Sequence, residues 1–458
     1  MNVCKVFVPY GALGTGISDE AFENGMALNP DIISVDGGST DSGPYYLGNG
    51  KCKYAREALK NDTRRMIVAA HQHNIPITIG SCGTCGVDEG VDFMEEICRE
   101  ILEEEGFSAK IAKIYTEQSI DVMKEKLRSG KIKPLGTRVE VSEEILDSCS
   151  HIVAAAGAEP FIKALNDGAD IVLCGRATDT AVLACMPIIK GCSEAAAWHG
   201  AKVCECGPLC STNPQNGGIF MTVDETGFEV EATASDSICT PYTVSAHLLY
   251  ENSDPFHLVE PGVVIDTSKA VYTQLENGRV RVENSSIIKS DVYTMKLEGA
   301  GPAGYQTITL VGIRDRIIMK NPLGWLENLR AFAQSKLDRL GYDNTRYSFS
   351  LRPYGYNAVY GGDVPEGYVP NEIGVLLTVT ADEQELATQI AKVMNPLLLH
   401  FEVEKNRPTP SFAFPFSPAE VVKGKIYEFK LYHVVEMDDP FELLRTTTIE
   451  VNGKGGKA

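Results

Sequence analysis

The stretch "DIISVDGGSTDSGP", residues 31–44, joins an apolar run to a segment that cannot build a core. Its first residues are mostly apolar and β-branched, as in a buried strand. The rest holds aspartates, serines, a threonine, glycines and a proline, which are typical of turns and loops. We interpret residues 31–36 as a buried strand whose carboxyl end opens into a polar loop, 36–44.

Short apolar strands alternate with helical segments on both sides of this stretch. Further strands are expected in "CKVFVPYG" (4–11), "IPITIGSC" (75–82), "AKIAKIYT" (109–116), "SHIVAAAG" (150–157) and "ADIVLCG" (169–175). The spacing of apolar residues predicts helices at 19–28, 54–74, 90–106, 118–130 and 160–168. Strands separated by helices predict a parallel sheet covered on both faces, and the segment 150–175 is expected to add one more strand–helix–strand unit to it.

The pattern changes near Gly207 to short alternating segments with turn residues between them. The "ENG" at 276–278 stands where a hairpin turn would. "KLEGAGPAGYQT" (296–307) interrupts a strand pattern, and we expect a loop packed close to a ligand, with Lys296 and Glu298 at its mouth.

Two helices, 323–341 and 382–401, and two strands, 346–355 and 371–381, predict an α+β layer near the C-terminus, with Pro396 expected to kink or split the second helix. The expected fold is therefore α/β, an N-terminal parallel sheet with helices on both faces followed by a β-rich α+β C-terminal half. The expected domains are a parallel α/β domain (1–206), a β-rich middle region (207–320) and an α+β region (321–458).

The chain of 458 residues has a net charge of −20 with its acidic residues scattered over the whole length. This charge argues against nucleic acid or an anionic membrane as a partner, because phosphate binding needs clustered Lys and Arg. No apolar run reaches the ~20 residues of a membrane span, and the N-terminus shows no secretory leader. We expect a cytoplasmic homo-oligomer that acts on a small molecule.

All thirteen cysteines lie between Cys4 and Cys239, and their odd number in a chain without a leader predicts reduced thiols. Cys82 and Cys85 have the C-x-x-C spacing of a redox or metal pair. They could equally be small residues at a crowded helix start. A helix N-terminus would lower the pKa of a thiol, so a nucleophilic Cys82 or Cys85 is a third interpretation.

Ligands of an open parallel sheet bind outside the carboxyl ends of its strands. This rule selects four glycine-rich polar loops, 9–18, 36–44, 80–90 and 175–181. Backbone N–H groups exposed there at helix N-termini favour an anion. The candidate substrate-binding residues are Gly14, Gly37, Gly38, Ser39, Thr40, Arg176 and Thr178. The glycines of "GALGTG" (11–16) lack the spacing of a dinucleotide fingerprint, and we interpret them as a tight turn.

Arg176 and Asp179, three residues apart in "GRATDTA" (175–181), are the most suggestive pair. The planar guanidinium could hold a substrate carboxylate while Asp179 acts as a base or metal ligand. An internal ion pair that orders the turn is the alternative. His199 is expected to be structural, and residues 247–267 are expected to form a solvated connection rather than a metal or acid/base site.

Six segments in this order resemble the acyclic terpene utilisation family, in its shorter, AtuA-like branch. They are "DGGSTDSGPYYLG", "DIVLCGRATDTAV", "AWHGAKVCECG", "TPYTVSAHLLYENSDPFHLVEPGVVIDT", "YTMKLEGAGPAGYQTI" and "GIRDR". The resemblance spans about residues 3–320. It implies a protein of bacterial carbon catabolism that is encoded near enzymes for branched acids or acyl-CoA compounds, and it supplies no mechanism. The C-terminal "KIYEFKLYHVVEMDDPFELLRTTTIEV" resembles a small companion domain that often accompanies this family as a separate protein.

The first hypothesis is a hydro-lyase or isomerase that abstracts a proton beside the carbonyl of a small hydroxy- or unsaturated carboxylate, free or as a CoA thioester. Asp36, Asp41 or Asp179 would be the base, Lys296 or Glu298 the acid, and Arg176 with the N–H groups of the loops would bind the carboxylate. A Mg²⁺ ion held by Asp36, Asp41 and Asp179 would serve the same end by stabilising an enolate. The cofactor is otherwise unassigned.

Two further hypotheses belong to other classes. The chain could be a non-catalytic subunit that works only with a small companion protein, as the C-terminal resemblance suggests. It could also be a thiol-dependent enzyme that uses Cys82 or Cys85.

Overall fold

The computed structural model describes residues 2–136, 140–215, 217–249, 252–403 and 412–453. The chain divides into two compact units, the first of Met1–Gly301 with Phe429–Ala458 and the second of Pro302–Glu428. These boundaries differ from the expected domains because the change of pattern near Gly207 marks a change of strand direction within one sheet. In the described part of the chain, no helix is both long and apolar enough to cross a membrane.

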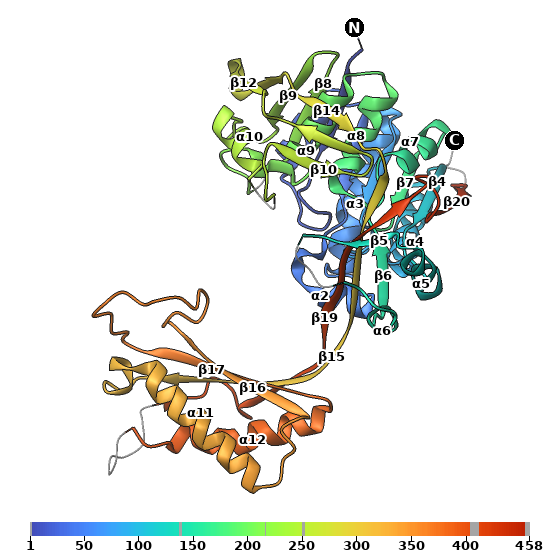
Figure 1. Ribbon diagram of the computed structural model, residues 1–458. Helices are drawn as coiled ribbons and strands as arrows, with labels where there is room; N and C mark the ends of the chain where they lie inside the picture. Colours follow the sequence, from blue (N-terminus) through green and yellow to red (C-terminus); the bar gives the residue numbers. More distant parts are fainter. Residues whose placement is uncertain (1, 137–139, 216, 250–251, 404–411, 454–458) are drawn as a thin grey trace. The chain divides into compact units, whose positions relative to one another are not determined.

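A ten-stranded sheet forms the centre of the first unit. Its five parallel strands stand in the order β1 (Cys4–Val8), β2 (Ile32–Asp36), β3 (Ile77–Gly80), β7 (Ile171–Cys174) and β4 (Ala109–Tyr115). Figure 1 labels the last two, β7 and β4, close to β20. Every residue of β2 is buried, as expected for a parallel strand covered on both faces. The predicted parallel α/β fold is therefore confirmed.

Helices cover the two faces of these strands. Ile33 and Val35 of β2 belong to a core shared with α1 (Asp19–Ala27), α3 (Arg56–His73) and α4 (Asp88–Glu105). Ile32, which points to the opposite face, belongs to a core shared with α7 (Glu159–Asn166), α8 (Asp179–Ile189) and α9 (Glu194–Cys204). The shorter helices are α2 (Pro44–Asn49), α5 (Ile120–Arg128), α6 (Glu143–Asp147) and α10 (Pro241–His247), with 3-10 turns at η1 (Thr40–Ser42) and η2 (Gly207–Cys210).

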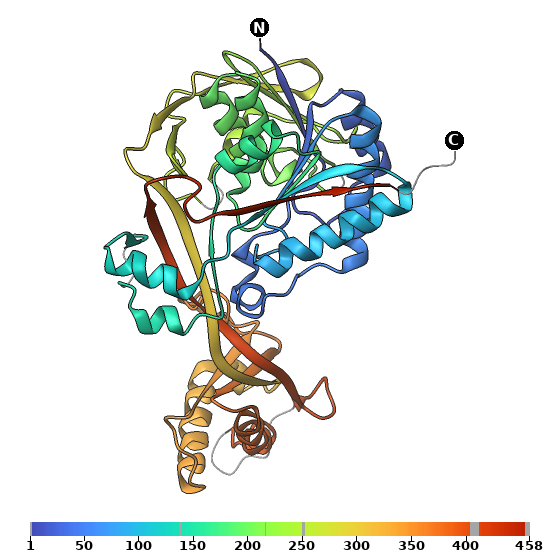
Figure 2. The same cartoon turned by 90° about the vertical axis from the view of Figure 1, so that its right-hand side faces the viewer.

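Antiparallel strands extend the sheet at both edges. Beyond β1 follow β8 (Ile219–Val223), β9 (Gly227–Ala232), β13 (Val280–Glu283) and β12 (Val271–Gln274). The turn η3 (Glu276–Gly278) joins β12 to β13 with Asn277 and Gly278 at positive φ, which confirms the predicted hairpin. At the other edge β20 (Arg445–Val451), red in Figure 2, lies beside the cyan β4.

Two expectations about strands were wrong. β6 (His151–Ala154) pairs antiparallel with β15 (Tyr293–Ile313) and does not join the parallel sheet. β15 also continues through the glycines that predicted a loop. The reason is close packing, because a Cβ on Gly301 would lie 1.9 Å from the carbonyl oxygen of Ser148 and a Cβ on Gly299 2.9 Å from Leu431.

The other strands of the first unit lie in smaller groups. β10 (His257–Glu260), β11 (Val263–Asp266) and β14 (Ser286–Lys289) form a three-stranded antiparallel sheet. β5 (Ile132–Pro134) pairs with β19 (Glu420–Met437). β15 and β19 each contribute residues to both units.

The second unit is the predicted α+β layer. Its strands are β16 (Tyr347–Tyr354), β17 (Ile373–Ala381), β18 (Phe412–Ala413) and the ends of β15 and β19 that belong to it, and its helices are α11 (Pro322–Arg339) and α12 (Gln384–His400), with η4 (Ile318–Lys320) before α11. The two helices pack on β15, β16 and β17 in one core. α12 continues through Pro396 without a break, so the expected split does not occur.

Candidate active site

Residues from all four loops line one pocket of ≈ 570 Å³ at the carboxyl ends of β1, β2, β3 and β7. The first loop contributes Gly11, Ala12, Thr15 and Gly16, the second Asp36, Gly38, Ser39, Asp41 and Ser42, the third Thr84 and the fourth Asp179. Lys53, Tyr54 and a wall of residues between Cys206 and Gly217 complete the lining. The pocket therefore lies where an open parallel sheet places its ligands.

Asp36, the last residue of β2, lies in this pocket and is 4% exposed. The N–H of Gly38 donates to its Oδ2 (3.1 Å), whereas its buried Oδ1 has no hydrogen-bond partner among the described residues. Burial, together with the charge of Asp179, raises the pKa of Asp36 well above its ordinary value. Burial thus favours the neutral, protonated form of this carboxyl group.

The glycines after Asp36 fit the chain closely against the third loop. The N–H of Gly37 donates to the carbonyl of Gly80 (2.7 Å), and a Cβ on Gly37 would lie 2.6 Å from that same oxygen. Gly38 has a φ of +136° and would meet the Cα of Thr84 at 2.8 Å if it carried a Cβ. These two glycines hold Asp36 in place by close approach.

Asp179 is the first residue of α8 and lines the same pocket. Thr178 caps the helix by accepting the N–H of Ala181 (3.4 Å). Burial raises the pKa of Asp179 to about 6, against the opposing charge of Arg176, whose Nη1 lies 3.4 Å from its Oδ1. Arg176 therefore favours the carboxylate form of Asp179, whereas burial favours the protonated form of Asp36.

Arg176 is buried in an ion network behind the pocket and does not line it. Its Nε donates to Oε2 of Glu298 (2.9 Å), and its Nη1 donates to Ser81 Oγ and to the carbonyl of Ala177 (both 2.9 Å). The geometry is that of an internal ion pair, the alternative considered for this residue.

Glu298 is the centre of the ion network, and its own carboxylate is 1% exposed. Thr40 donates its hydroxyl to Oε1 (2.9 Å), and Lys296 Nζ lies 2.8 Å from the same atom. Burial alone would raise the pKa of Glu298, but the charges of Arg176 and Lys296 outweigh it and hold the pKa at about 2. Glu298 therefore has no proton to donate at neutral pH.

Cys82 and Cys85 are buried free thiols. Burial raises the pKa of Cys85 to about 11 and that of Cys82 well above its ordinary value. The direction is opposite to the lowering expected at a helix N-terminus, because neither thiol reaches the water or a cation that a thiolate needs. Neither cysteine lines the pocket.

The first loop already holds a carboxylate of the chain itself. The N–H groups of Gly14 and Gly16 donate to Oδ2 of Asp62 on α3 (2.9 and 3.1 Å). Gly14 and Gly16 adopt positive φ, which glycine tolerates without strain. Asp62 thus orders the wall formed by residues 11–16, and Gly14 is not among the residues that line the pocket.

The third loop carries backbone strain that no sequence pattern indicated. Ser81 and Thr84 adopt φ of 45° and 79°, and a β-branched residue at positive φ is a rare conformation found at functional sites. Thr84 Oγ1 accepts the N–H of Lys53 (3.0 Å). The strained turn therefore fixes Ser81 against Arg176 and brings Lys53 to the pocket.

Lys53 carries the one Lys or Arg charge in the pocket lining within the described residues. It lies exposed in the connection between α2 and α3, and its Nζ donates to Ser42 Oγ (2.8 Å). Lys53 and the wall between Cys206 and Gly217 were not found from the sequence, because neither follows a strand directly. Lys53 thus gives a pocket lined by three aspartates one group suited to an anion.

Asp41 stands exposed in the pocket lining, with its N–H bonded to Ser39 Oγ (3.3 Å). Within the described ranges, the one group of three metal-ligand side chains with all ligand atoms inside 4.8 Å of one another is Glu89, Glu117 and His151. The carboxylates of Asp36, Asp41 and Asp179 are therefore not gathered in this way.

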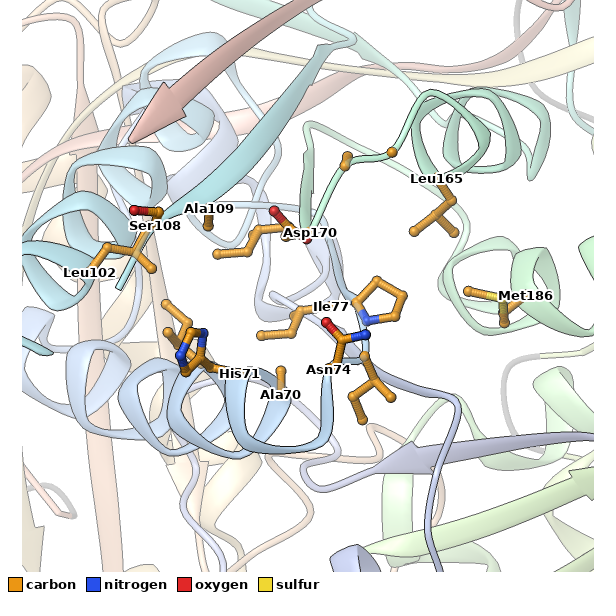
Figure 3. A pocket seen from close by; sticks show the side chains of 16 residues that line it. Ala70, His71, Asn74, Ile77, Leu102, Ser108, Ala109, Leu165, Asp170 and Met186 are labelled. Atoms are coloured by element: carbon orange, nitrogen blue, oxygen red, sulfur yellow. The ribbon is translucent and has the colours of Figure 1, made fainter. Parts of the chain in front are cut away.

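A second pocket of ≈ 440 Å³ lies at the amino ends of β3, β4 and β7 (Figure 3). Most of the residues that line it are apolar, Ile77 and Leu102 among them, and the ring of the lining residue His71 stacks on Phe107 with ring centroids 3.8 Å apart. None of the site residues expected from the sequence lines it. Asp36, Asp41 and Asp179 line the pocket at the carboxyl ends of the strands instead.

Comparison with family models matches residues 46–403 to the acyclic terpene utilisation family protein AtuA. The match covers more than three quarters of the chain, including Arg176, Asp179 and Glu298, and begins after the loop of Asp36. A comparison with curated proteins found no match, and neither did a comparison with solved structures.

Proposed function

The chain belongs to the acyclic terpene utilisation family, and we propose that its pocket catalyses proton transfer on a small hydroxy- or unsaturated carboxylate or on the corresponding CoA thioester. The reaction class is hydration and dehydration or isomerisation, in bacterial carbon catabolism. The observation that carries this proposal is that two aspartates, the buried Asp36 and the half-buried Asp179, line one pocket in surroundings that favour different protonation states.

Two titratable groups whose surroundings favour different protonation states can act as the acid and the base of one reaction. Asp179 is the base, because Arg176 stabilises its charged form. Asp36 is the acid, because its buried Oδ1 lacks a donor that would stabilise a charge. This assignment replaces Lys296 and Glu298 as acids, since both are held in the ion network of Arg176.

In a dehydration, this pair moves one proton from the substrate carbon to Asp179 and one from Asp36 to the leaving hydroxyl. Asp179 takes the proton from the carbon beside the carbonyl, and the C–H electron pair forms the new double bond. The C–O bond of the β-hydroxyl breaks, and the oxygen leaves as water with the proton of Asp36. Asp179 ends protonated and Asp36 ionised, and a proton returned through solvent resets the pair. In an isomerisation Asp36 protonates a carbon instead.

Lys53 is the proposed anchor for the substrate carboxylate. Arg176, the anchor expected from the sequence, has its Nε and Nη1 committed to Glu298, Ser81 and the carbonyl of Ala177. Lys53 lies at the pocket with an exposed ammonium group. An ammonium can donate to a carboxylate while its stem lies along the wall.

Deuterium exchange tests the proposal on a panel of compounds, so the substrate need not be identified first. The protein is incubated in D₂O with 2- and 3-hydroxy acids, the matching unsaturated acids and their CoA thioesters, and proton NMR follows C–H exchange and alkene formation. We expect exchange with a subset of the panel and a loss of about 10³-fold in Asp179→Asn, the range of general base catalysis. Asp41→Asn, on the rim of the same pocket, is the matched control and should retain exchange.

The pH dependence gives a second readout of the same assignment. The rate at low substrate concentration should rise as pH increases through about 6, where Asp179 becomes the carboxylate. The rise should be absent from the residual activity of Asp179→Asn. Exchange on no member of the panel, or an unchanged pH profile in Asp179→Asn, would contradict the proposal.

A Mg²⁺ ion at Asp36, Asp41 and Asp179 is the alternative way to stabilise an enolate here. Oxygen ligands suit this ion, although the three carboxylates would have to move together to bind it. Treatment with EDTA followed by Mg²⁺ separates the two mechanisms. Exchange that is lost with EDTA and restored by Mg²⁺ indicates the metal, and unchanged exchange indicates the carboxyl pair alone.

One observation favours the second hypothesis, a subunit that works with a companion protein. Val359 and Tyr360, on the loop between β16 and β17 of the second unit, are 88% and 87% exposed. Apolar side chains on such a loop are typical of an interaction surface. If the chain is a subunit, the purified protein should show no exchange alone and should gain it on addition of a small companion protein of the kind that its C-terminal segment resembles.

The thiol-dependent alternative has a direct test. The double variant Cys82→Ala, Cys85→Ala removes both candidate nucleophiles. Because both thiols are buried outside the pocket, we expect this variant to keep the exchange activity of the parent. Loss of exchange with an unchanged unfolding midpoint would indicate a thiol mechanism.

A further inference from the structure

A buried hydrogen-bonded chain lies beside the pocket and is not used by the acid–base pair. Thr180, in the first turn of α8, places its Oγ1 2.5 Å from Oε2 of Glu205 and 2.9 Å from Oε1 of Glu260 at the end of β10. Lys202 of α9 donates to Oε1 of Glu205 (2.6 Å). Asp179, which precedes Thr180, and Cys206, which follows Glu205, both line the pocket.

The hydroxyl of Thr180 determines how many of the two glutamates in this hydrogen-bonded chain are protonated. A threonine hydroxyl has a single hydrogen to donate, and it can accept in addition. It lies within hydrogen-bond distance of two glutamate oxygens, so it donates to one of them. The other contact is a hydrogen bond only if that glutamate supplies the proton. One of Glu205 and Glu260 is therefore protonated.

The charges of Glu205, Glu260 and Lys202 also indicate that one of the two glutamates is protonated. Glu205 and Glu260 are each 6% exposed, and with both ionised the ammonium of Lys202 would leave one buried negative charge uncompensated. A buried charge without a partner is strongly unfavourable. Lys202 contacts Glu205, whereas Oε2 of Glu260 is buried and has no hydrogen-bond partner among the described residues. The proton therefore belongs on Glu260.

The titratable groups around Glu260 agree with a proton on Glu260 rather than on Glu205. Burial raises the pKa of both Glu260 and Glu205 against the charge of Lys202, but the hydrogen bond from Lys202 stabilises the ionised form of Glu205 alone. Tyr293 donates its hydroxyl to Glu159 (2.6 Å), and burial raises its pKa above its ordinary value. Burial lowers the pKa of His247, which feels the charge of Lys202, to about 4, so this imidazole adds no charge near neutral pH. Burial also raises the pKa of Cys206 and keeps it a neutral thiol.

We propose that Glu260 holds a proton at neutral pH and donates it to Thr180, which donates in turn to the ionised Glu205, and that this chain fixes the negative charge of Glu205 beside Asp179. Glu260, Thr180 and Glu205 are positioning residues. Their role in catalysis rests on the proposed function, because the charge of Glu205 raises the pKa of Asp179 and so increases its strength as a base.

Infrared spectroscopy tests the protonation directly and needs no substrate. A protonated carboxyl group has a C=O band at higher frequency than a carboxylate, and the band shifts in D₂O. We expect a band of this kind at neutral pH that is lost in Glu260→Gln and kept in Glu159→Gln, a control on a nearby glutamate. A spectrum in which Glu260→Gln removes only carboxylate intensity would overturn the proposal.

Thermal unfolding at neutral pH is a second test of the proton on Glu260. Glutamine is close in shape to a protonated glutamate and can donate to Thr180, so Glu260→Gln should leave the unfolding midpoint unchanged. Glu205→Gln should lower it by about 4 °C, because Lys202 loses its buried partner. Thr180→Ser keeps the hydroxyl and should unfold at a higher temperature than Thr180→Val. A midpoint lowered equally in Glu260→Gln and Glu205→Gln would overturn the assignment.

The two arms separate this inference from the proposed function. If the Glu260 band and the unfolding pattern appear and no panel compound exchanges, the proposed function fails and the protonated Glu260 stands. If exchange occurs but the Glu260 band is absent at neutral pH, the proposed function stands and this inference fails.

Discussion

At the scale of single residues, the pocket is supported by charges that never touch it. Arg176 compensates Glu298 and orients Asp179, and Thr40 connects the second loop to the same carboxylate. A buried ion pair contributes little net stability, but removing one partner leaves the other charge uncompensated. Removing the Arg176 side chain should therefore destabilise the fold, although Arg176 does not line the pocket.

Arg176→Ala should lower the free energy of unfolding by about 3 kcal/mol, because Glu298 then stays buried with Lys296 as its remaining cation. Urea denaturation followed by circular dichroism measures this. Lys296→Ala, whose side chain is 32% exposed, is the matched control and should cost less. Because the pKa of Glu298 is held at about 2, its stabilisation is complete above its ordinary value of 4.5 and is lost as pH falls toward 2. A stable Arg176→Ala would contradict this account.

His199 should make the stability of the fold depend on pH. It is fully buried on α9, where its Nδ1 lies 2.7 Å from Ser285 Oγ and its Nε2 lies 3.2 Å from the hydroxyl of Tyr272. Burial lowers its pKa from 6.5 to about 3. Below 6.5 the unfolded chain takes up a proton that the folded chain does not, so stability falls by about 1.4 kcal/mol for each pH unit from this group.

The variant His199→Gln should therefore show a shallower loss of stability than the parent between pH 6.5 and about pH 5. Urea denaturation at a series of pH values measures the slope. His73→Gln, which changes an exposed histidine, should keep the slope of the parent. Equal slopes in the parent and in His199→Gln would show that another group dominates in this range.

At the scale of elements, glycine has opposite meanings in two parts of the chain. In the loops after β1 and β2 it accompanies turns, with Gly14, Gly16, Gly38 and Gly43 at positive φ, although Gly37 and Gly38 also pack closely on the third loop. In β15 it allows a strand to pack closely against residues 148–149, although the same residue type predicted a loop. Composition cannot separate these cases, because the reason for the glycine is a neighbour distant in sequence.

Gly301→Ala tests this interpretation of β15. The added Cβ would lie 1.9 Å from the carbonyl oxygen of Ser148, so the strand must shift, and we expect a cost of about 2 kcal/mol, as for other overpacked sites. Gly312→Ala on the same strand meets its nearest atom, the carbonyl oxygen of Ala413, at 3.6 Å and should stay within about 0.5 kcal/mol of the parent. Urea denaturation compares them, and equal costs would refute the packing argument.

The sequence predicted the elements with strong periodicity and missed the contacts between distant ones. β2, α3 and α4 lie where the spacing of apolar residues placed them. The pairing of β6 with β15 could not be foreseen, because "HIVA" fits a parallel and an antiparallel neighbour equally well. In the site, the rule of carboxyl ends led to Asp36 and Asp179, whereas Lys53 enters from a helix connection that no local pattern marks.

At the scale of the whole molecule, the two units have separate hydrophobic cores. The core of the second unit is built from residues 311–414, and the cores of the first unit contain none of them. Each unit also contains one of the two tryptophans, Trp198 on α9 and Trp325 on α11. Both indoles are largely buried, so their fluorescence should report the two unfolding transitions separately.

Core truncations in single-tryptophan variants test whether the cores are energetically independent. In the Trp198→Phe background, Leu329→Ala on α11 should lower the stability reported by Trp325 by about 3 kcal/mol, because a buried leucine is replaced by a cavity. In the Trp325→Phe background the same change should leave the transition of Trp198 unmoved. Ile97→Ala on α4 is the matched control and should act the other way round. A joint shift of both transitions would mean that the units unfold as one.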